Sequence, residues 1–111
     1  MDTLIRDYFA AWSGSDVDAL VAFVTEDVDF EDVGAGHRCS GSREFREFVE
    51  MCNVRVPDAR YDVVDSRVLD DTYWVEWVMQ PMGLRGASVG RLREGKIAVN
   101  RDYWARVRPA H

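Results

Sequence analysis

A chain of 111 residues and 12.7 kDa is long enough for one hydrophobic core and one modest pocket, so residues 1–111 are predicted to form a single domain. A hydrophobic fraction of 47% with an aromatic fraction of 12% excludes a disordered chain. The net charge of −6 argues against nucleic acid and anionic membranes as partners, because both attract basic surfaces.

Targeting and cofactor signals are weak throughout the sequence. No apolar run is long enough for a transmembrane helix, and Asp2 and Asp7 flank the first apolar residues, which is not typical of a signal peptide. We therefore expect a cytoplasmic protein. Cys39 and Cys52 are predicted to be free thiols, and with His37 they match no zinc-binding pattern. Phosphate-binding loops and dinucleotide fingerprints are missing too, so neither a metal nor a cofactor is expected.

The first half of the chain predicts mainly helices. Apolar residues at three- and four-residue spacing predict helices over 3–12, 16–24 and 42–52. Between the second and third helices, alternating apolar and polar residues predict a short strand over 28–33. A loop that begins with glycines is expected over 34–41.

The second half predicts four strands, over 60–69, 73–79, 84–93 and 97–107, separated by turn residues. The expected order is therefore α-α-β-α-β-β-β-β. Helices followed by a meander of strands indicate an α+β fold, in which a curved antiparallel sheet wraps around the three N-terminal helices as a cone-shaped α+β barrel. The open mouth of such a cone is a natural ligand pocket.

Several local strings carry a family resemblance, and they extend over most of the chain. They are Tyr8-Phe9-Ala10-Ala11-Trp12, Phe30-Glu31-Asp32, Gly41-Ser42-Arg43-Glu44-Phe45, Gly95-Lys96-Ile97 and Asn100-Arg101-Asp102-Tyr103-Trp104. Together with the element order they resemble the nuclear transport factor 2-like superfamily, in particular its SnoaL-like polyketide cyclase and ketosteroid isomerase-like branch. The resemblance is specific for the fold, whereas the superfamily includes isomerases, cyclases, epoxide hydrolases and proteins without catalysis.

The ketosteroid isomerase pattern, a worked example of pKa tuning, implies roles for three positions. Tyr8 matches the catalytic tyrosine of the first helix, and Asp32 matches the general base at the end of the first strand. Ser88 falls where those isomerases place a protonated Asp as second oxyanion donor, and neither Ala87 nor Val89 beside it is acidic.

The cyclase and epoxide hydrolase patterns imply a further acid on the last strand. Asp102 matches the working Asp that SnoaL-like cyclases and limonene-type epoxide hydrolases place there. Those hydrolases also use an Arg and an Asp two residues apart on the second meander strand, where this chain has Glu76 and Val78. Their first-strand site holds a water-orienting Asn, and this chain has Asp32 there.

Strand alternation alone also points to acids in an apolar pocket. Asp32 shares a strand face with Phe30, Asp102 shares one with Trp104, and Glu76 shares one with Trp74. Carboxylates among large apolar side chains lose water, which raises their pKa toward the range needed by a general acid or base. Tyr8, Asp32 and Asp102 are the predicted catalytic residues. The predicted pocket residues are Trp12, Phe30, His37, Trp74, Glu76, Ser88 and Trp104.

The sequence does not decide which face of residues 73–79 lines the pocket, because both faces carry aromatic residues. Whichever face points outward would expose Trp or Tyr, so we expect a homodimer through the convex side of the sheet, as the resemblance also implies. The expected function is cofactor-independent proton transfer on a hydrophobic carbonyl-bearing small molecule, as a cyclase or isomerase. An epoxide hydrolase or hydratase, or a dimer that only binds a hydrophobic ligand, remains the alternative.

Overall fold

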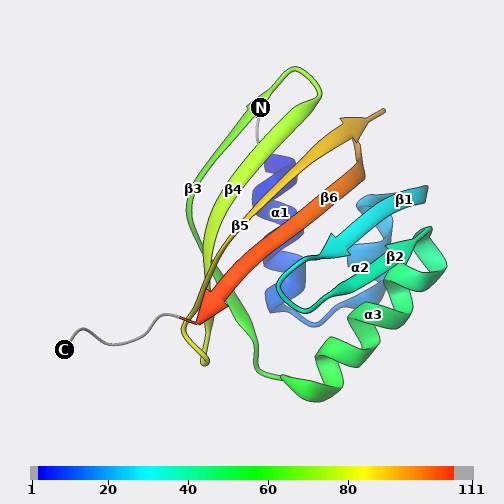
Figure 1. Cartoon of the computed structure of the whole chain (residues 1–111). Coiled ribbons are helices and arrows are strands. Elements are labelled where there is room, and N and C mark those ends of the chain that lie inside the picture. The colour runs from blue at the N-terminus through cyan, green and yellow to red at the C-terminus, as the bar shows by residue number, and fades with distance from the viewer. Residues whose placement is uncertain (1–2, 107–111) are drawn as a thin grey trace.

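The structure is a computed structural model that describes residues 3–106. Within these residues, three helices and six strands follow one another (Figure 1). The elements are α1 (Thr3–Ser13), α2 (Val17–Ala22), β1 (Val24–Asp32), β2 (His37–Ser40), α3 (Ser42–Arg55), β3 (Arg60–Leu69), β4 (Thr72–Gln80), β5 (Leu84–Arg93) and β6 (Lys96–Arg106).

All six strands form one sheet in the order β2-β1-β6-β5-β4-β3. The strands from β3 to β6 are an antiparallel meander, and β1 pairs with β6 in parallel. The sheet is curved and unclosed, and α1 and α3 lie on one side of it (Figure 1). The predicted α+β fold is confirmed. The parallel pairing matters for the site because it brings the carboxyl ends of β1 and β6 to the same place.

The structure corrects the prediction in three places within the first half of the chain. The second helix ends at Ala22 rather than residue 24, and β1 begins directly afterwards at Val24. Residues 37–40 form β2 rather than loop, because they pair with β1 and bury Cys39 opposite Phe30. The third helix continues to Arg55, three residues beyond its predicted end. Val107, the predicted last residue of the final strand, lies outside the described residues.

The inner face of β4 is formed by Tyr73, Val75, Trp77 and Met79, all of them buried. They face α1 across a core that also holds Ile5, Phe9, Phe30 and Phe45. Trp74 and Glu76 therefore lie on the outer face, because successive strand residues point to opposite sides. The alternation of residues did not show which face of β4 is inside, and the burial of its side chains now does.

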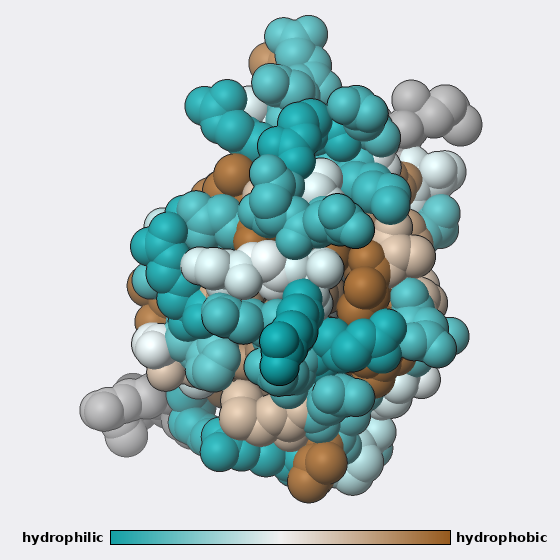
Figure 2. All heavy atoms as spheres, turned by 90° about the vertical axis from the view of Figure 1, so that its right-hand side faces the viewer, coloured by the Kyte–Doolittle hydropathy of each residue, from teal (hydrophilic) through white to brown (hydrophobic). Residues whose placement is uncertain are grey.

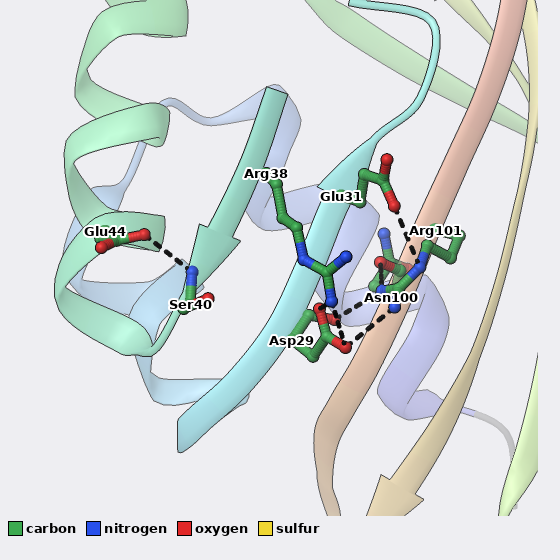
Figure 3. Close-up of polar contacts among 7 residues, drawn as sticks. All are labelled: Asp29, Glu31, Arg38, Ser40, Glu44, Asn100 and Arg101. Atoms are coloured by element: carbon green, nitrogen blue, oxygen red, sulfur yellow. Dashed lines mark hydrogen bonds and ion pairs between the residues drawn. The ribbon is translucent and has the colours of Figure 1, made fainter. Parts of the chain in front are cut away.

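Polar contacts cover the outer face of β2, β1 and β6. The Arg101 guanidinium lies 2.8 Å from an Asp29 carboxylate oxygen and 3.3 Å from one of Glu31, and Arg38 reaches Asp29 at 3.1 Å (Figure 3). The side of the molecule that Figure 2 presents is covered largely by hydrophilic side chains. These ion pairs are partly exposed, so we assign them a modest role in stability.

No helix within residues 3–106 is long and apolar enough to cross a membrane. Both cysteines are free thiols, with Cys39 buried and Cys52 partly buried.

Candidate active site

A cavity of about 160 Å³ lies between the inner face of the sheet, α1 and the C-terminal end of α3. Aromatic and aliphatic side chains form most of its wall, and two carboxylates, those of Asp32 and Asp102, reach it from β1 and β6. Its aromatic wall residues are Tyr8, Phe9, Trp12, Phe48, Tyr61, Trp77 and Trp104. A mostly apolar cavity with a few convergent polar groups is the usual form of a small-molecule site.

Asp32 and Asp102 are direct partners in the parallel pairing of β1 with β6. In adjacent strands, paired residues lie side by side and point to the same face of the sheet. Both side chains line the cavity. The sequence predicted each acid separately, and the structure brings the two together.

Asp102 is held by one of its two carboxylate oxygens. Its Oδ1 accepts a hydrogen bond of 2.5 Å from the Ser88 hydroxyl and one of 2.7 Å from Nδ2 of Asn100. Behind these donors, Trp77 Nε1 donates to Ser88 Oγ at 2.9 Å, and the Tyr73 hydroxyl donates to Oδ1 of Asn100. Oδ2 of Asp102 accepts no hydrogen bond from residues 3–106. One oxygen is therefore fixed, and the other is available to a ligand.

Burial raises the pKa of Asp102 to about 6, although the hydrogen bonds from Ser88 and Asn100 oppose the change. The nearby Asp32 carboxylate raises the pKa further, because two like charges repel. Asp102 is partly buried and lines the cavity. A carboxyl group with this pKa exchanges protons readily near neutral pH, as a general acid or base must.

Asp32 is fixed in a similar way. Its Oδ1 accepts a hydrogen bond of 2.6 Å from Trp104 Nε1 and one of 3.0 Å from the Ala35 backbone amide. The second bond closes the turn that follows β1. Gly34 in this turn faces the Trp104 indole so closely that a Cβ would collide with the ring. The glycine therefore allows Trp104 to reach Asp32.

Tyr8 projects from α1 into the same cavity, and its side chain is fully buried. Its hydroxyl has no hydrogen-bond partner among the described residues, and the neighbouring Trp12 indole does not meet hydrogen-bond geometry. Burial raises the pKa of this hydroxyl well above its usual value of 10.0, so it stays protonated. An unpaired buried donor is costly unless a ligand accepts its hydrogen bond.

Trp12 and Trp104 also line the cavity, as the sequence predicted. Ser88 does not line it, but its hydroxyl holds Asp102 from behind. Phe30 is fully buried against Phe45, beneath the cavity rather than on its wall.

Three predicted pocket residues lie elsewhere. His37 stacks on Phe48, with 4.7 Å between ring centroids, and is not part of the cavity wall. Trp74 and Glu76 are on the outer face of the sheet, where Glu76 pairs with Arg85 at 3.2 Å. Their placement in the pocket is corrected, since the inner face of β4 presents Trp77 instead.

Several cavity residues were not predicted, among them Tyr61, Trp77 and Arg55. Asn100 was not predicted either; it does not line the cavity and acts through its hydrogen bond to Asp102. Trp77 had a sequence signal. Gly86 on the neighbouring strand is its partner, and a Cβ there would collide with the Trp77 ring. Glycine opposite an aromatic residue indicates the crowded inner face. Arg55 is an exposed residue of the last turn of α3, and nothing in the sequence marks it as a rim residue.

The chemistry available in the cavity is that of carboxyl and hydroxyl groups. Burial raises the pKa of Cys39 and of Cys52 to about 11, so both are protonated and weakly nucleophilic at neutral pH. Across residues 3–106, no group of three or more His, Cys, Asp or Glu side chains is placed to hold a metal ion.

An α+β fold in which a curved β-sheet wraps around helices, with carboxylates inside an apolar cavity, defines the nuclear transport factor 2-like class of domains. Residues 5–100 match the family model described as a SnoaL-like domain. Because the match extends over most of the chain, the protein belongs to the SnoaL-like family.

Solved structures share this fold at low sequence identity. A hypothetical protein with a ketosteroid isomerase-like fold from Catenulispora acidiphila, in complex with trimethylamine, is 18% identical over 95% of this chain and 87% of its own, with a TM-score of 0.88. A protein from Sinorhizobium meliloti, provisionally named a polyketide cyclase, is 20% identical over 93% and 95%, with a TM-score of 0.79. A Kribbella flavida protein, provisionally named a ketosteroid isomerase, is 20% identical over 98% and 80%, with a TM-score of 0.78.

These likenesses establish the fold alone. Comparison with functionally curated proteins gives no significant match.

Proposed function

We propose that the protein is a cofactor-independent enzyme that transfers protons on a small, hydrophobic, carbonyl-bearing molecule, as a cyclase or an isomerase. The observation that carries this proposal is the position of Asp102, whose carboxyl group lines an apolar cavity beside Asp32 and is held by Ser88 and Asn100 through only one of its oxygens. A buried acid tuned toward neutral pH, in a cavity with an unpaired hydroxyl donor, is typical of acid–base sites.

The proposed reaction begins with Oδ2 of Asp102, which removes a proton from the carbon next to the carbonyl group. The electron pair of the broken C–H bond moves to the carbonyl oxygen, and the Tyr8 hydroxyl donates a hydrogen bond to the resulting enolate. Isomerisation follows when Asp102 returns the proton to a different carbon. Cyclisation follows when the enolate carbon instead attacks a second carbonyl carbon of the same molecule, whose oxygen then takes the proton from Asp102.

The size of the cavity limits the substrate. At about 160 Å³ it is close to an engineered cavity of about 150 Å³ that binds benzene. A single ring or a short chain fits inside, whereas a molecule of several fused rings would extend out of the mouth. We therefore propose a substrate whose reacting part is no larger than one ring.

Hydrogen exchange tests the proposal without knowledge of the natural substrate. Cyclohexanone and 3-cyclohexen-1-one are incubated with the protein in D₂O, and NMR follows deuterium at the carbon next to the carbonyl group and migration of the double bond. We expect protein-dependent exchange that is lost in Asp102→Asn. Exchange equal to that of buffer with both compounds would contradict the proposal.

Epoxide opening is a second candidate, favoured by the side-by-side arrangement of Asp32 and Asp102. In that reaction protonated Asp102 gives its proton to the epoxide oxygen as the ring C–O bond breaks, and Asp32 orients the attacking water and takes a proton from it. Cyclohexene oxide in ¹⁸O-labelled water separates the two candidates, because ring opening places labelled oxygen in a diol, whereas enolisation adds none.

A further inference from the structure

The cavity concentrates negative charge and aromatic surface in one small volume. We propose that it is a binding site for a small organic cation of the alkylammonium class, held between the carboxylates of Asp32 and Asp102 and the surrounding aromatic rings. This inference goes beyond the proposed function, since it concerns binding and does not require turnover.

The first support is the charge of the interior. Asp32 and Asp102 are partners on adjacent strands, and each has an Oδ2 that accepts no hydrogen bond from the described residues. Among the described residues that line the cavity, Arg55 is the one with a cationic side chain, and it is exposed at the end of α3. Two neighbouring carboxylates repel one another, and a ligand with a positive charge relieves that repulsion.

The second support is the aromatic wall. Rings from three different elements line the same cavity as the carboxylates, namely Tyr8 and Trp12 of α1, Tyr61 of β3 and Trp77 of β4. Tyr61 and Trp77 meet edge to face, with 5.2 Å between their centroids, which holds both rings in place. Aromatic faces attract cations, most strongly when water is excluded, and groups of such rings are the common way to recognise alkylammonium groups.

The third support comes from size and from Tyr8. A volume of about 160 Å³ suits a trialkylammonium group with a short chain. The Tyr8 hydroxyl is a donor without a partner and needs an acceptor, which an ammonium group cannot supply. The ligand is therefore expected to carry an oxygen as well, as an amino alcohol or an amino ketone does. In an amino ketone, the ammonium charge would also offset the charge of an enolate formed between two carboxylates.

Choline and its neutral isostere 3,3-dimethylbutan-1-ol provide the test. The two molecules have the same shape and the same hydroxyl group, so any difference in affinity reports the charge alone. Calorimetry and tryptophan fluorescence follow each titration with the unmodified protein at pH 8. We expect choline to bind saturably and at least about tenfold more tightly than the isostere, which is the scale of a desolvated cation–π contact.

Substitution and pH then locate the charge. Asp102→Asn should weaken choline binding about tenfold, whereas Asp62→Asn, which removes a charge from the exposed outer side of β3, should leave it unchanged. For the unmodified protein, choline affinity should fall about tenfold between pH 8 and pH 5, because Asp102 has a pKa of about 6 and is protonated over that interval. The titratable or charged groups that also face the cavity are Tyr8, Asp32, Cys52, Arg55 and Tyr61.

Each outcome decides the proposal. Preference for choline, weakened by Asp102→Asn and by low pH but not by Asp62→Asn, supports it. Equal binding of choline and its isostere, tighter binding of the isostere, or no binding of either at millimolar concentration overturns it, and these comparisons do not depend on whether a variant folds. Failure of the proposed function is distinct, because it appears as absent deuterium exchange with neutral ketones whether or not choline binds.

Discussion

Asp32 and Asp102 are paired residues on parallel neighbouring strands, and each accepts hydrogen bonds through one carboxylate oxygen while the other oxygen accepts none from the described residues. Different groups donate to the two Oδ1 atoms. The Trp104 indole and the Ala35 amide donate to Asp32, and the Ser88 hydroxyl and the Asn100 amide donate to Asp102. The cavity therefore receives two oriented acceptors. The following predictions test what this arrangement does.

The first prediction concerns turnover. Asp102→Asn should lower the rate of deuterium exchange by about two to four decades, the usual contribution of a general base. The fold should persist, because the amide oxygen of Asn can accept the same hydrogen bonds from Ser88 and Asn100. Circular dichroism checks the fold, and NMR in D₂O measures exchange. Asp62→Asn is the matched control and should retain the full rate.

The second prediction concerns stability against pH. The pKa of Asp102 is about 6 in the folded protein and near its ordinary 3.8 when unfolded. Between these values the folded state binds more protons, so the free energy of unfolding falls as the pH rises, by up to about 3 kcal/mol for this group. Asp102→Asn should therefore be more stable than the unmodified protein at pH 7.5 and lose that advantage toward pH 4. Urea denaturation at both pH values measures the difference, and an advantage that grows toward low pH would contradict the burial of Asp102.

Tyr8→Phe is predicted to separate activity from stability. The unpaired buried hydroxyl costs free energy in the empty cavity, so its removal should leave the stability unchanged or slightly increased. Deuterium exchange should nevertheless fall about a hundredfold, as when one oxyanion donor is lost. Ser88 cannot replace the donor, because its hydroxyl is already engaged with Asp102. Paired measurements of the unfolding midpoint and the exchange rate test this, and a drop in stability without a drop in rate would assign Tyr8 to the core alone.

The sequence predicted the fold, and it placed Tyr8, Asp32 and Asp102 at the cavity, because each of these placements depends on local pattern. Tyr8 lies on the apolar stripe of a helix, and Asp32 and Asp102 share strand faces with large apolar residues. Alternation could not decide which face of β4 is inside, because both of its faces are apolar. The prediction that Trp74 and Glu76 line the pocket was therefore wrong. The deciding signal was on the neighbouring strand, where Gly86 and Gly90 leave room for Trp77 and Tyr73.

Other features depend on long-range pairing, which a single sequence does not show. The four residues of β2 have little strand signal of their own and are strand because they pair with β1. The parallel pairing of β1 with β6 likewise joins segments far apart in the chain, and it alone places Asp32 beside Asp102. Arg55 reaches the cavity mouth only because α3 continues beyond its predicted end.

The last prediction concerns assembly. The outer face of β4, β5 and β6 exposes Trp74, Val89 and Tyr103 at 38%, 42% and 49%, and Trp74 pairs directly with Val89 across the sheet. We propose that this apolar patch is where two copies of the chain meet, because a contiguous apolar surface on a curved sheet favours a symmetric partner.

Light scattering should therefore give about twice the 12.7 kDa mass of one chain at micromolar concentration. Trp74→Glu should give the single-chain mass, because it removes the largest apolar side chain of the patch and places a charge in the contact, where its burial costs free energy. Val54→Glu is the matched control, since Val54 is 82% exposed on α3, away from the patch, and should stay dimeric. A single-chain mass for the unmodified protein, or an equal effect of both substitutions, would show that this face is not the interface.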